Sequence, residues 1–216
     1  MKHIFRIAID GPSGAGKSTV AKTVAARLGI DYIDTGAMYR AVGLKMLNHG
    51  MPMEESDGLK NMLAQTDIDF SKGDIILDGQ IVNDLIRTPE VSMAASACSA
   101  LESVRKKLVE LQRKMGQTKS VVMDGRDIGT NVLTDAEYKY FLTASAEERA
   151  KRRFEELLEK GESVQLDKVL KEIELRDYND STRALNPLKR ASDAEEIDST
   201  RMTVEQVVNY ICGKIV

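Results

Sequence analysis

Residues 11–18 read Gly-Pro-Ser-Gly-Ala-Gly-Lys-Ser and match the spacing GxxxxGK[ST] of a phosphate-binding loop. An apolar run at residues 4–9 precedes the segment and predicts a strand, and a helical pattern follows over residues 17–28. Glycines let backbone N–H groups curve around a polyphosphate, and the helix N-terminus directs its dipole at the same oxygens. Because both flanks fit, a glycine-rich turn that matches by chance is disfavoured.

This loop predicts binding of a nucleoside triphosphate with Mg²⁺. Lys17 is placed to reach the β- and γ-phosphates, and the hydroxyl of Ser18 is placed to ligate the metal. The residues expected to bind the triphosphate are consecutive: Gly11, Pro12, Ser13, Gly14, Ala15, Gly16, Lys17, Ser18 and Thr19.

A second charged segment follows the apolar run at residues 121–123. Asp124 stands where the strand ends, which is where a nucleotide-binding fold of this kind places the acid that orients the water shell of Mg²⁺. Arg126 and Asp127 then bring a cation and a second carboxylate to the same strand end. The alternative is a turn with solvated charges, although loops at strand ends commonly carry function.

Two further groups of arginines have helical spacing. Arg149, Arg152 and Arg153 share one helix face, but an ion pair between Glu148 and Arg152 would support a merely solvated face.

In the second group, Arg176, Asp180 and Arg183 also share a face, and here the spacing favours anion binding. Arginine suits phosphate because its planar group donates two parallel hydrogen bonds. Thr35 is placed to cap the start of another predicted helix and Arg40 to face an anion, although an ordinary capped helix is the simpler interpretation.

The composition is that of a globular protein: 216 residues, 42% hydrophobic and 30% charged, with a net charge of −3. The negative charge argues against bulk nucleic-acid binding, and no apolar run approaches the length of a membrane span. The start Met1-Lys2-His3 leads directly to the predicted first strand, so we expect no signal peptide. Cys98 and Cys212 lack metal-binding spacing, so we expect buried or partly buried thiols in a reducing compartment.

Alternating strand and helix patterns predict an α/β protein with a parallel sheet covered by helices and ligands at the carboxyl ends of the strands. The predicted strands lie at residues 4–10, 31–34, 121–124, 138–142 and 194–198. The predicted helices lie at residues 17–28, 35–48, 54–64, 89–99, 101–114, 146–160 and 166–179, with a last one capped by Thr203.

The pattern changes at residues 68–83, where short β-like segments predict a small antiparallel meander. Asp78-Gly79 is a strong hairpin signal, and Lys72-Gly73-Asp74 separates the first two segments. Ser99 and Glu102 have the spacing of a capping box for the helix that follows.

Taken together, the motifs make the chain resemble the bacterial cytidylate kinases over nearly its whole length. The resemblance rests on the following segments: residues 9–19 (IDGPSGAGKST), 34–40 (DTGAMYR), 86–91 (IRTPEV), 124–130 (DGRDIGT) and 176–177 (RD). It implies a single P-loop kinase domain over residues 1–216, with a core at about 1–60, 116–146 and 185–216. It also implies an inserted β/α part for the nucleoside monophosphate at about 61–115 and a helical lid with flanking helices at about 147–184.

The resemblance also implies roles for individual residues. The monophosphate site would comprise Thr35, Tyr39, Arg40, Ser96, Arg105, Asp127, Arg176, Asp180 and Arg183. Arg149 and Arg153 would bind ATP, and the catalytic groups would be Lys17, Arg126, Arg152 and Arg176. Metal binding would fall to Ser18 and, through water, to Asp124.

One segment departs from the pattern of this family. After Gly129-Thr130 the family usually continues Val-Val-Phe-Pro-Asp-Ala, whereas residues 131–136 here read Asn-Val-Leu-Thr-Asp-Ala. The departure flanks the site but removes no residue with an implied role.

The activity that the resemblance implies is transfer of a phosphoryl group from Mg·ATP to CMP or dCMP. We expect a cytoplasmic monomer with no nucleic-acid or membrane partner. A kinase for another small acceptor is the nearer alternative. A GTPase switch is more distant, because the sequence has no Asn-Lys-x-Asp element to read guanine.

Overall fold

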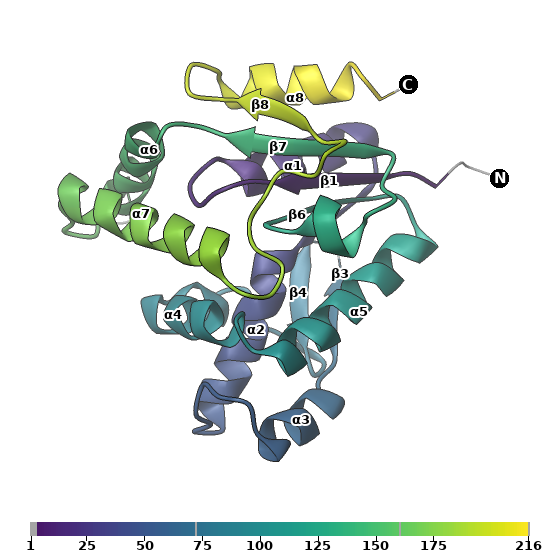
Figure 1. Cartoon of the computed structure of the whole chain (residues 1–216), viewed down its shortest axis with the longest axis vertical. Helices are drawn as coiled ribbons and strands as arrows, with labels where there is room; N and C mark the ends of the chain where they lie inside the picture. The colour runs from purple at the N-terminus through teal and green to yellow at the C-terminus, as the bar shows by residue number, and fades with distance from the viewer. Residues whose placement is uncertain (1–3, 72, 160, 216) are drawn as a thin grey trace. The chain divides into compact units, whose positions relative to one another are not determined.

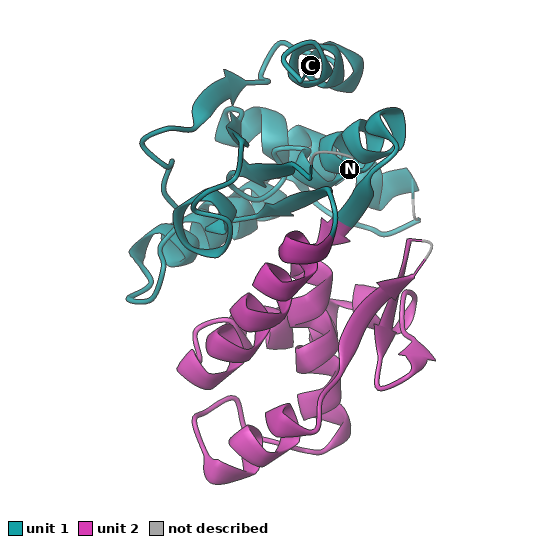
Figure 2. Cartoon of the chain, turned by 90° about the vertical axis from the view of Figure 1, so that its right-hand side faces the viewer, with its two compact units in different colours: residues 1–32, 119–216 teal, residues 33–118 magenta. Residues whose placement is uncertain are grey.

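The computed structural model describes residues 4–71, 73–159 and 161–215 (Figure 1). The chain divides into two compact units, Met1–Tyr32 with Lys119–Val216 and Ile33–Thr118 (Figure 2). The expected start at residues 1–3 and the predicted positions of Lys72 and Lys160 lie outside the described residues. The predicted division into core, insert and lid stays a prediction.

The first unit is built on a five-stranded sheet in the order β2-β6-β1-β7-β8, and the pairs β1–β6, β1–β7 and β7–β8 are parallel. The predicted α/β fold with a parallel sheet is therefore confirmed. The strands of this sheet are β1 (Arg6–Asp10), β2 (Asp31–Asp34), β6 (Val121–Gly125), β7 (Tyr138–Thr143) and β8 (Glu195–Asp198), and the last two residues of β2 are counted with the second unit. Its helices are α1 (Lys17–Leu28), α6 (Ala146–Glu159), α7 (Leu166–Thr182) and α8 (Val204–Cys212).

The core of this unit lies between the sheet and the helices α1 and α8. Ile7 and Ile9 of β1, Val24 of α1 and Val208 of α8 are fully buried in one hydrophobic cluster. The strand register brings Asp10 opposite Gly125, so β1 and β6 end at the same level and their loops emerge together. That edge is where the sequence places its charged motifs.

Helices α6 and α7 pack against each other through a small hydrophobic cluster of their own. Ala150 and Leu157 of α6 contact Val169 and Ile173 of α7 in this cluster. The apolar side chains between the two helices hold them together, while their outer faces carry charged side chains. This explains why two such polar helices form a stable pair.

The second unit combines four α-helices and a short 3-10 helix, Leu85–Arg87, with an antiparallel sheet in the order β3-β4-β5. Its elements are α2 (Thr35–Asn48), α3 (Asp57–Ala64), β3 (Ile68–Ser71), β4 (Asp74–Leu77), β5 (Gln80–Ile81), α4 (Pro89–Cys98) and α5 (Glu102–Thr118). Asp78 and Gly79 both have positive φ, 49° and 81°, which is the geometry of a tight hairpin turn. The predicted meander is therefore confirmed.

Helices α2 and α4 approach very closely at Gly43. A Cβ atom on this residue would lie 2.9 Å from the backbone nitrogen of Ala95 and 3.2 Å from the Cβ of Ala94. Because only a hydrogen fits between the two helices, this glycine sets their separation.

The N-terminus of α5 is capped differently from the prediction. The Ser99 hydroxyl, expected in a capping box, donates to the carbonyl oxygen of Ser96 at the end of α4. The first turn of α5 is instead satisfied by Glu55, whose carboxylate accepts from the Ser103 backbone N–H (2.9 Å) and hydroxyl (2.8 Å). These donors, the backbone N–H first, lower the pKa of Glu55.

Among residues 4–71, 73–159 and 161–215, no helix has the length and apolar character needed to cross a bilayer.

Candidate functional site

The phosphate-binding loop leads into α1 as predicted. Gly16 precedes the helix in the left-handed conformation (φ 83°), and Lys17 is its first residue. The Lys17 ammonium is buried and donates to the carbonyl oxygen of Pro12 at 2.7 Å. Burial lowers the pKa of Lys17 well below its usual value, and the charges of Arg126 and Arg176 lower it further.

Asp124 links β6 to this loop. Its Oδ2 atom accepts a hydrogen bond from the Ser18 hydroxyl at 2.8 Å, and its Oδ1 atom accepts one from the Tyr32 hydroxyl at 2.8 Å. The two residues predicted to serve the metal therefore lie side by side. Their oxygen atoms are the donor type that Mg²⁺ prefers.

The loop is also held from the side of α6 and α7. The backbone N–H of Ser13 donates to Oδ1 of Asp177 at 3.1 Å, and the Ser13 carbonyl oxygen accepts from Nη1 of Arg149 at 2.8 Å. Nη1 of Arg149 also donates to Oδ2 of Asp177 at 2.6 Å. The sequence assigned no role to Asp177, and nothing in its spacing indicates this contact.

Asp10, at the end of β1, is a second residue that sequence reasoning missed. Its buried carboxylate accepts the backbone N–H groups of Ile128 (2.8 Å) and Gly129 (2.7 Å) at the start of a π-helical turn, Ile128–Val132. Burial raises the pKa of Asp10 to about 6, against the effect of the two N–H donors. Asp10 thereby fixes the turn that follows Arg126 and Asp127.

The predicted residues Arg126, Asp127, Asp180 and Arg183 form one chain of ion pairs. Nε of Arg126 donates to Oδ2 of Asp180 at 2.7 Å, and Nη1 of Arg183 lies 3.8 Å from Oδ1 of Asp180. Nη2 of Arg183 donates to Oδ1 of Asp127 at 3.2 Å. Asn131, the first residue of the segment that departs from the family pattern, donates to Oδ2 of Asp127 at 3.1 Å.

The other predicted arginines of this unit have different surroundings. Arg152 donates to the carbonyl oxygen of Ser199 at 2.7 Å and to Glu148 at 3.1 Å, so the ion pair expected from the helix spacing is present. Arg153 is exposed and pairs with Glu156 at 2.9 Å. Arg176 is exposed on α7, and its charge reaches Lys17 strongly enough to lower the pKa of that lysine.

In the second unit, Asp34 organises the start of α2. Its Oδ1 atom caps the helix by accepting from the backbone N–H of Ala37 at 2.8 Å, and its Oδ2 atom accepts from Nη2 of Arg40 at 3.1 Å. The predicted cap Thr35 is instead the first residue of α2 and is buried. The guanidinium of Arg40 is thus oriented along the first turn of the helix.

Three more residues predicted for the monophosphate lie near the junction of α4 and α5. The guanidinium of Arg105 stacks on the ring of Tyr39, 5.8 Å from its centroid, and donates to the carbonyl oxygen of Ser99 at 3.2 Å. Arg105 is almost fully buried, whereas Ser96 is exposed on α4. Arg105 and Tyr39 are therefore brought together, and Ser96 lies one turn of helix before Ser99.

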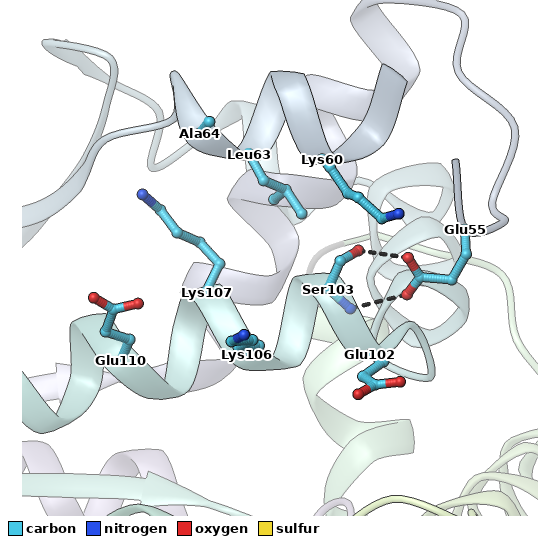
Figure 3. Close-up of a pocket in the computed structure, with 9 residues that line it drawn as sticks. All are labelled: Glu55, Lys60, Leu63, Ala64, Glu102, Ser103, Lys106, Lys107 and Glu110. Carbon is cyan, nitrogen blue, oxygen red and sulfur yellow. Dashed lines mark hydrogen bonds between the residues drawn. The ribbon is translucent and has the colours of Figure 1, made fainter. Parts of the chain in front are cut away.

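A separate groove of about 600 Å³ lies between α3 and α5 (Figure 3). Its walls carry three lysines and three glutamates, so their charges balance, and Glu55 is already engaged with Ser103. None of the residues predicted to bind a nucleotide lines it. We assign no ligand to this groove.

The family model and the curated relatives agree on one family. The family model described as Cytidylate kinase matches residues 7–216. A cytidylate kinase of Caldicellulosiruptor saccharolyticus is 54% identical over 215 residues, covering 98% of this chain and 95% of the relative. A cytidylate kinase of Clostridium perfringens is 49% identical over 211 residues, covering 98% of this chain and 97% of the relative.

A solved structure is similar in fold. It is described as an uncharacterized protein from Eubacterium ventriosum, is 15% identical, has a TM-score of 0.56 and covers 98% of both chains. At this identity the likeness concerns the fold alone. The family model and the curated relatives span nearly the whole chain, and the chain belongs to the cytidylate kinase family.

Proposed function

We propose that this protein transfers the γ-phosphoryl group of Mg·ATP to CMP or dCMP, giving ADP and CDP or dCDP. The observation that carries the proposal is the identity of about half of all residues with cytidylate kinases over 98% of the chain. An oxygen of the acceptor phosphate forms the new bond to the γ-phosphorus, and the bond to the β-phosphate oxygen breaks. The acceptor is already ionised, so positioning and charge neutralisation supply the catalysis.

On the donor side, the loop and the N-terminus of α1 bind the triphosphate. The Lys17 ammonium exchanges its hydrogen bond to the carbonyl oxygen of Pro12 for bonds to the β- and γ-phosphates. The phosphates favour the protonated form of the lysine, which burial alone disfavours. Arg126 and Arg176 neutralise the negative charge on the transferring phosphoryl group. Both positive charges already lower the pKa of Lys17.

Ser18 and Asp124 would hold Mg²⁺, the serine directly and the carboxylate through water. The ion supplies charge neutralisation at the phosphate oxygens. Mg²⁺ sites of this kind commonly use one or two protein oxygens together with substrate phosphates, and the two side chains offer such a set.

For the monophosphate, we propose separate roles for residues of each unit. In residues 33–118, the arginines Arg40 and Arg105 supply cations, and Thr35, Tyr39 and Ser96 supply hydroxyl groups. In the other unit, Asp127 accepts from the exocyclic amine of cytosine, where uracil would present an acceptor. Arg183 and Asp180 hold this carboxylate in place through the ion-pair chain.

The test is steady-state turnover with Mg·ATP and a panel of nucleoside monophosphates and other small acceptors. We expect CMP and dCMP to give the highest kcat/KM. Preference for a different acceptor would support another P-loop kinase, and nucleotide hydrolysis without any acceptor would support a switch.

A further inference from the structure

The backbone of Ser13, in the phosphate-binding loop, is hydrogen-bonded at both its N–H and its carbonyl oxygen by one pair of side chains. Its N–H donates to Asp177 and its carbonyl accepts from Arg149, and these two side chains are joined by a bond of 2.6 Å. The three contacts form a closed ring that includes one peptide segment of the loop. Closed rings of this kind restrict the backbone more than any single hydrogen bond does.

The surroundings of Arg149 show that its position is built into the fold. Its side chain is only 7% exposed, and Nε donates to the carbonyl oxygen of Ala144 at 2.9 Å. A Cβ atom on Gly14 would lie 3.2 Å from the Cβ of Arg149, and Gly14 itself has a φ of +75°. Helix α6 therefore packs directly against the loop at Gly14. Glycine suits this position because it leaves room for Arg149 and adopts a positive φ without strain.

The pairing of Arg149 with Asp177 also limits the electrostatic repulsion between this carboxylate and a bound triphosphate. A carboxylate beside a phosphate-binding loop would repel a triphosphate. Asp177 uses one of its two oxygens to accept from Ser13 and the other to accept from Arg149. The Arg149 guanidinium cancels the charge of Asp177 at 2.6 Å. The loop thus gains a rigid anchor at Ser13 without a net negative charge.

We propose that Arg149 and Asp177 are a positioning pair that fixes the phosphate-binding loop to α6 and α7, and that Arg149 does not itself bind ATP. This inference rests on the proposed function, and it replaces the direct ATP contact that the resemblance implies for Arg149. The pair holds the loop at Ser13 so that the following N–H groups are already oriented when the triphosphate arrives.

The two roles predict opposite behaviour of a double variant. If Arg149 acts through Asp177, then Arg149→Met leaves an unpaired carboxylate beside the loop, and the added substitution Asp177→Asn removes that charge and restores part of the loss. If Arg149 also binds ATP directly, the double variant binds ATP well below the level of Asp177→Asn alone, because the lost contact was made to the ligand and removal of the carboxylate does not replace it.

The experiment measures the Kd for Mg·ATP by calorimetry, together with kcat and KM for both substrates, in four proteins. They are the parent, Arg149→Met, Asp177→Asn and the double variant. We expect Arg149→Met to weaken ATP binding by about ten-fold or more, and the double variant to recover to within about three-fold of Asp177→Asn alone. Lys151→Met, at an exposed lysine on α6, controls for the loss of a positive charge and should leave the Kd unchanged.

Losses that simply add in the double variant would overturn the proposal. A fall in melting temperature with an unchanged Kd for ATP would overturn it too, because the pair would then only stabilise the fold. The proposed function fails separately: if the parent protein binds ATP but does not phosphorylate CMP or dCMP, the calorimetric cycle still tests the pair.

Discussion

The Lys17 ammonium lies 2.7 Å from the carbonyl oxygen of Pro12, within the same loop that both residues help to form. In this position the ammonium group is buried and bonded to the loop backbone. Its pKa is lowered chiefly by burial, so the ligand-free protein holds this cation at a cost that a polyphosphate would remove.

A pH dependence of ATP binding follows from Lys17. Because its pKa without ligand is lowered and the phosphates would raise it again, binding of Mg·ATP should take up a proton in mildly alkaline buffer, and the affinity should fall as the pH rises. Calorimetry in two buffers of different ionisation enthalpy measures this uptake.

The control for this prediction is Lys17→Met, which should bind without that uptake. Lys17→Ala should also abolish phosphoryl transfer while the protein stays folded. Equal proton uptake in the parent and in Lys17→Met would show that another group titrates, and normal turnover by folded Lys17→Ala would contradict the proposed transfer.

Arg152 should act in the transition state, although its donors here reach Ser199 and Glu148. We expect Arg152→Ala to lower kcat more than it raises KM, since an arginine that stabilises the transferring group contributes after substrate has bound. Steady-state kinetics with both substrates measure the split. A rise in KM alone would make the arginine a ground-state ligand, and a change in thermal stability alone would limit it to the contact with Ser199.

Asp127 should read the cytosine base. Asp127→Asn replaces an acceptor by a group that can donate, so it should weaken turnover of CMP and narrow the CMP-over-UMP ratio of kcat/KM by about ten-fold or more. As a matched control, Asn131→Ala removes a donor to the same carboxylate but keeps its charge. That control should change the ratio by less than about three-fold. An unchanged ratio in Asp127→Asn would mean that the carboxylate orders the loop and does not read the base.

Two helical glycines should respond to alanine with opposite signs. Gly58→Ala in α3 should raise the free energy of unfolding by about 0.5–1 kcal/mol, because alanine favours the helix and its Cβ would make only ordinary contacts. Gly43→Ala should lower it by about 1–3 kcal/mol, because the Cβ would overlap the backbone of α4 at 2.9 Å. Urea denaturation of both variants measures the difference. Stabilisation by both would show that α2 and α4 can separate without cost.

The elements with strong local signals were predicted well. Helix Lys17–Leu28 has the predicted ends, since the phosphate-loop pattern marks its start and Gly29, with a φ of 65°, closes it. Helix Thr35–Asn48 likewise agrees with the prediction, and Asp34 caps it. The dipeptide Asp78-Gly79 alone predicts the hairpin turn, because both residues readily adopt the positive φ that the turn requires.

Contacts between residues distant in sequence were not predictable. Asp10 accepts from an N–H 118 positions later, and Glu55 caps a helix 48 positions later. No local pattern encodes either contact, because each depends on which strand or helix end the fold brings near. The spacing of Arg149 showed which side chains share its helix face, but it could not show that this face meets Ser13. The individual roles of the predicted site residues stay predictions until the variants are measured.

The strand that carries the phosphate-binding loop, β1, has its two neighbours in β6 and β7, and both are encoded after the whole of residues 33–118. During translation, β1 is made before β6 and β7, and the interval is on the order of ten seconds at ordinary synthesis rates. The whole compact unit Ile33–Thr118 is synthesised within that interval. The strand that carries the nucleotide loop is therefore synthesised well before both of the strands that pair with it, and its backbone groups stay without those partners until residues 121–143 have been made.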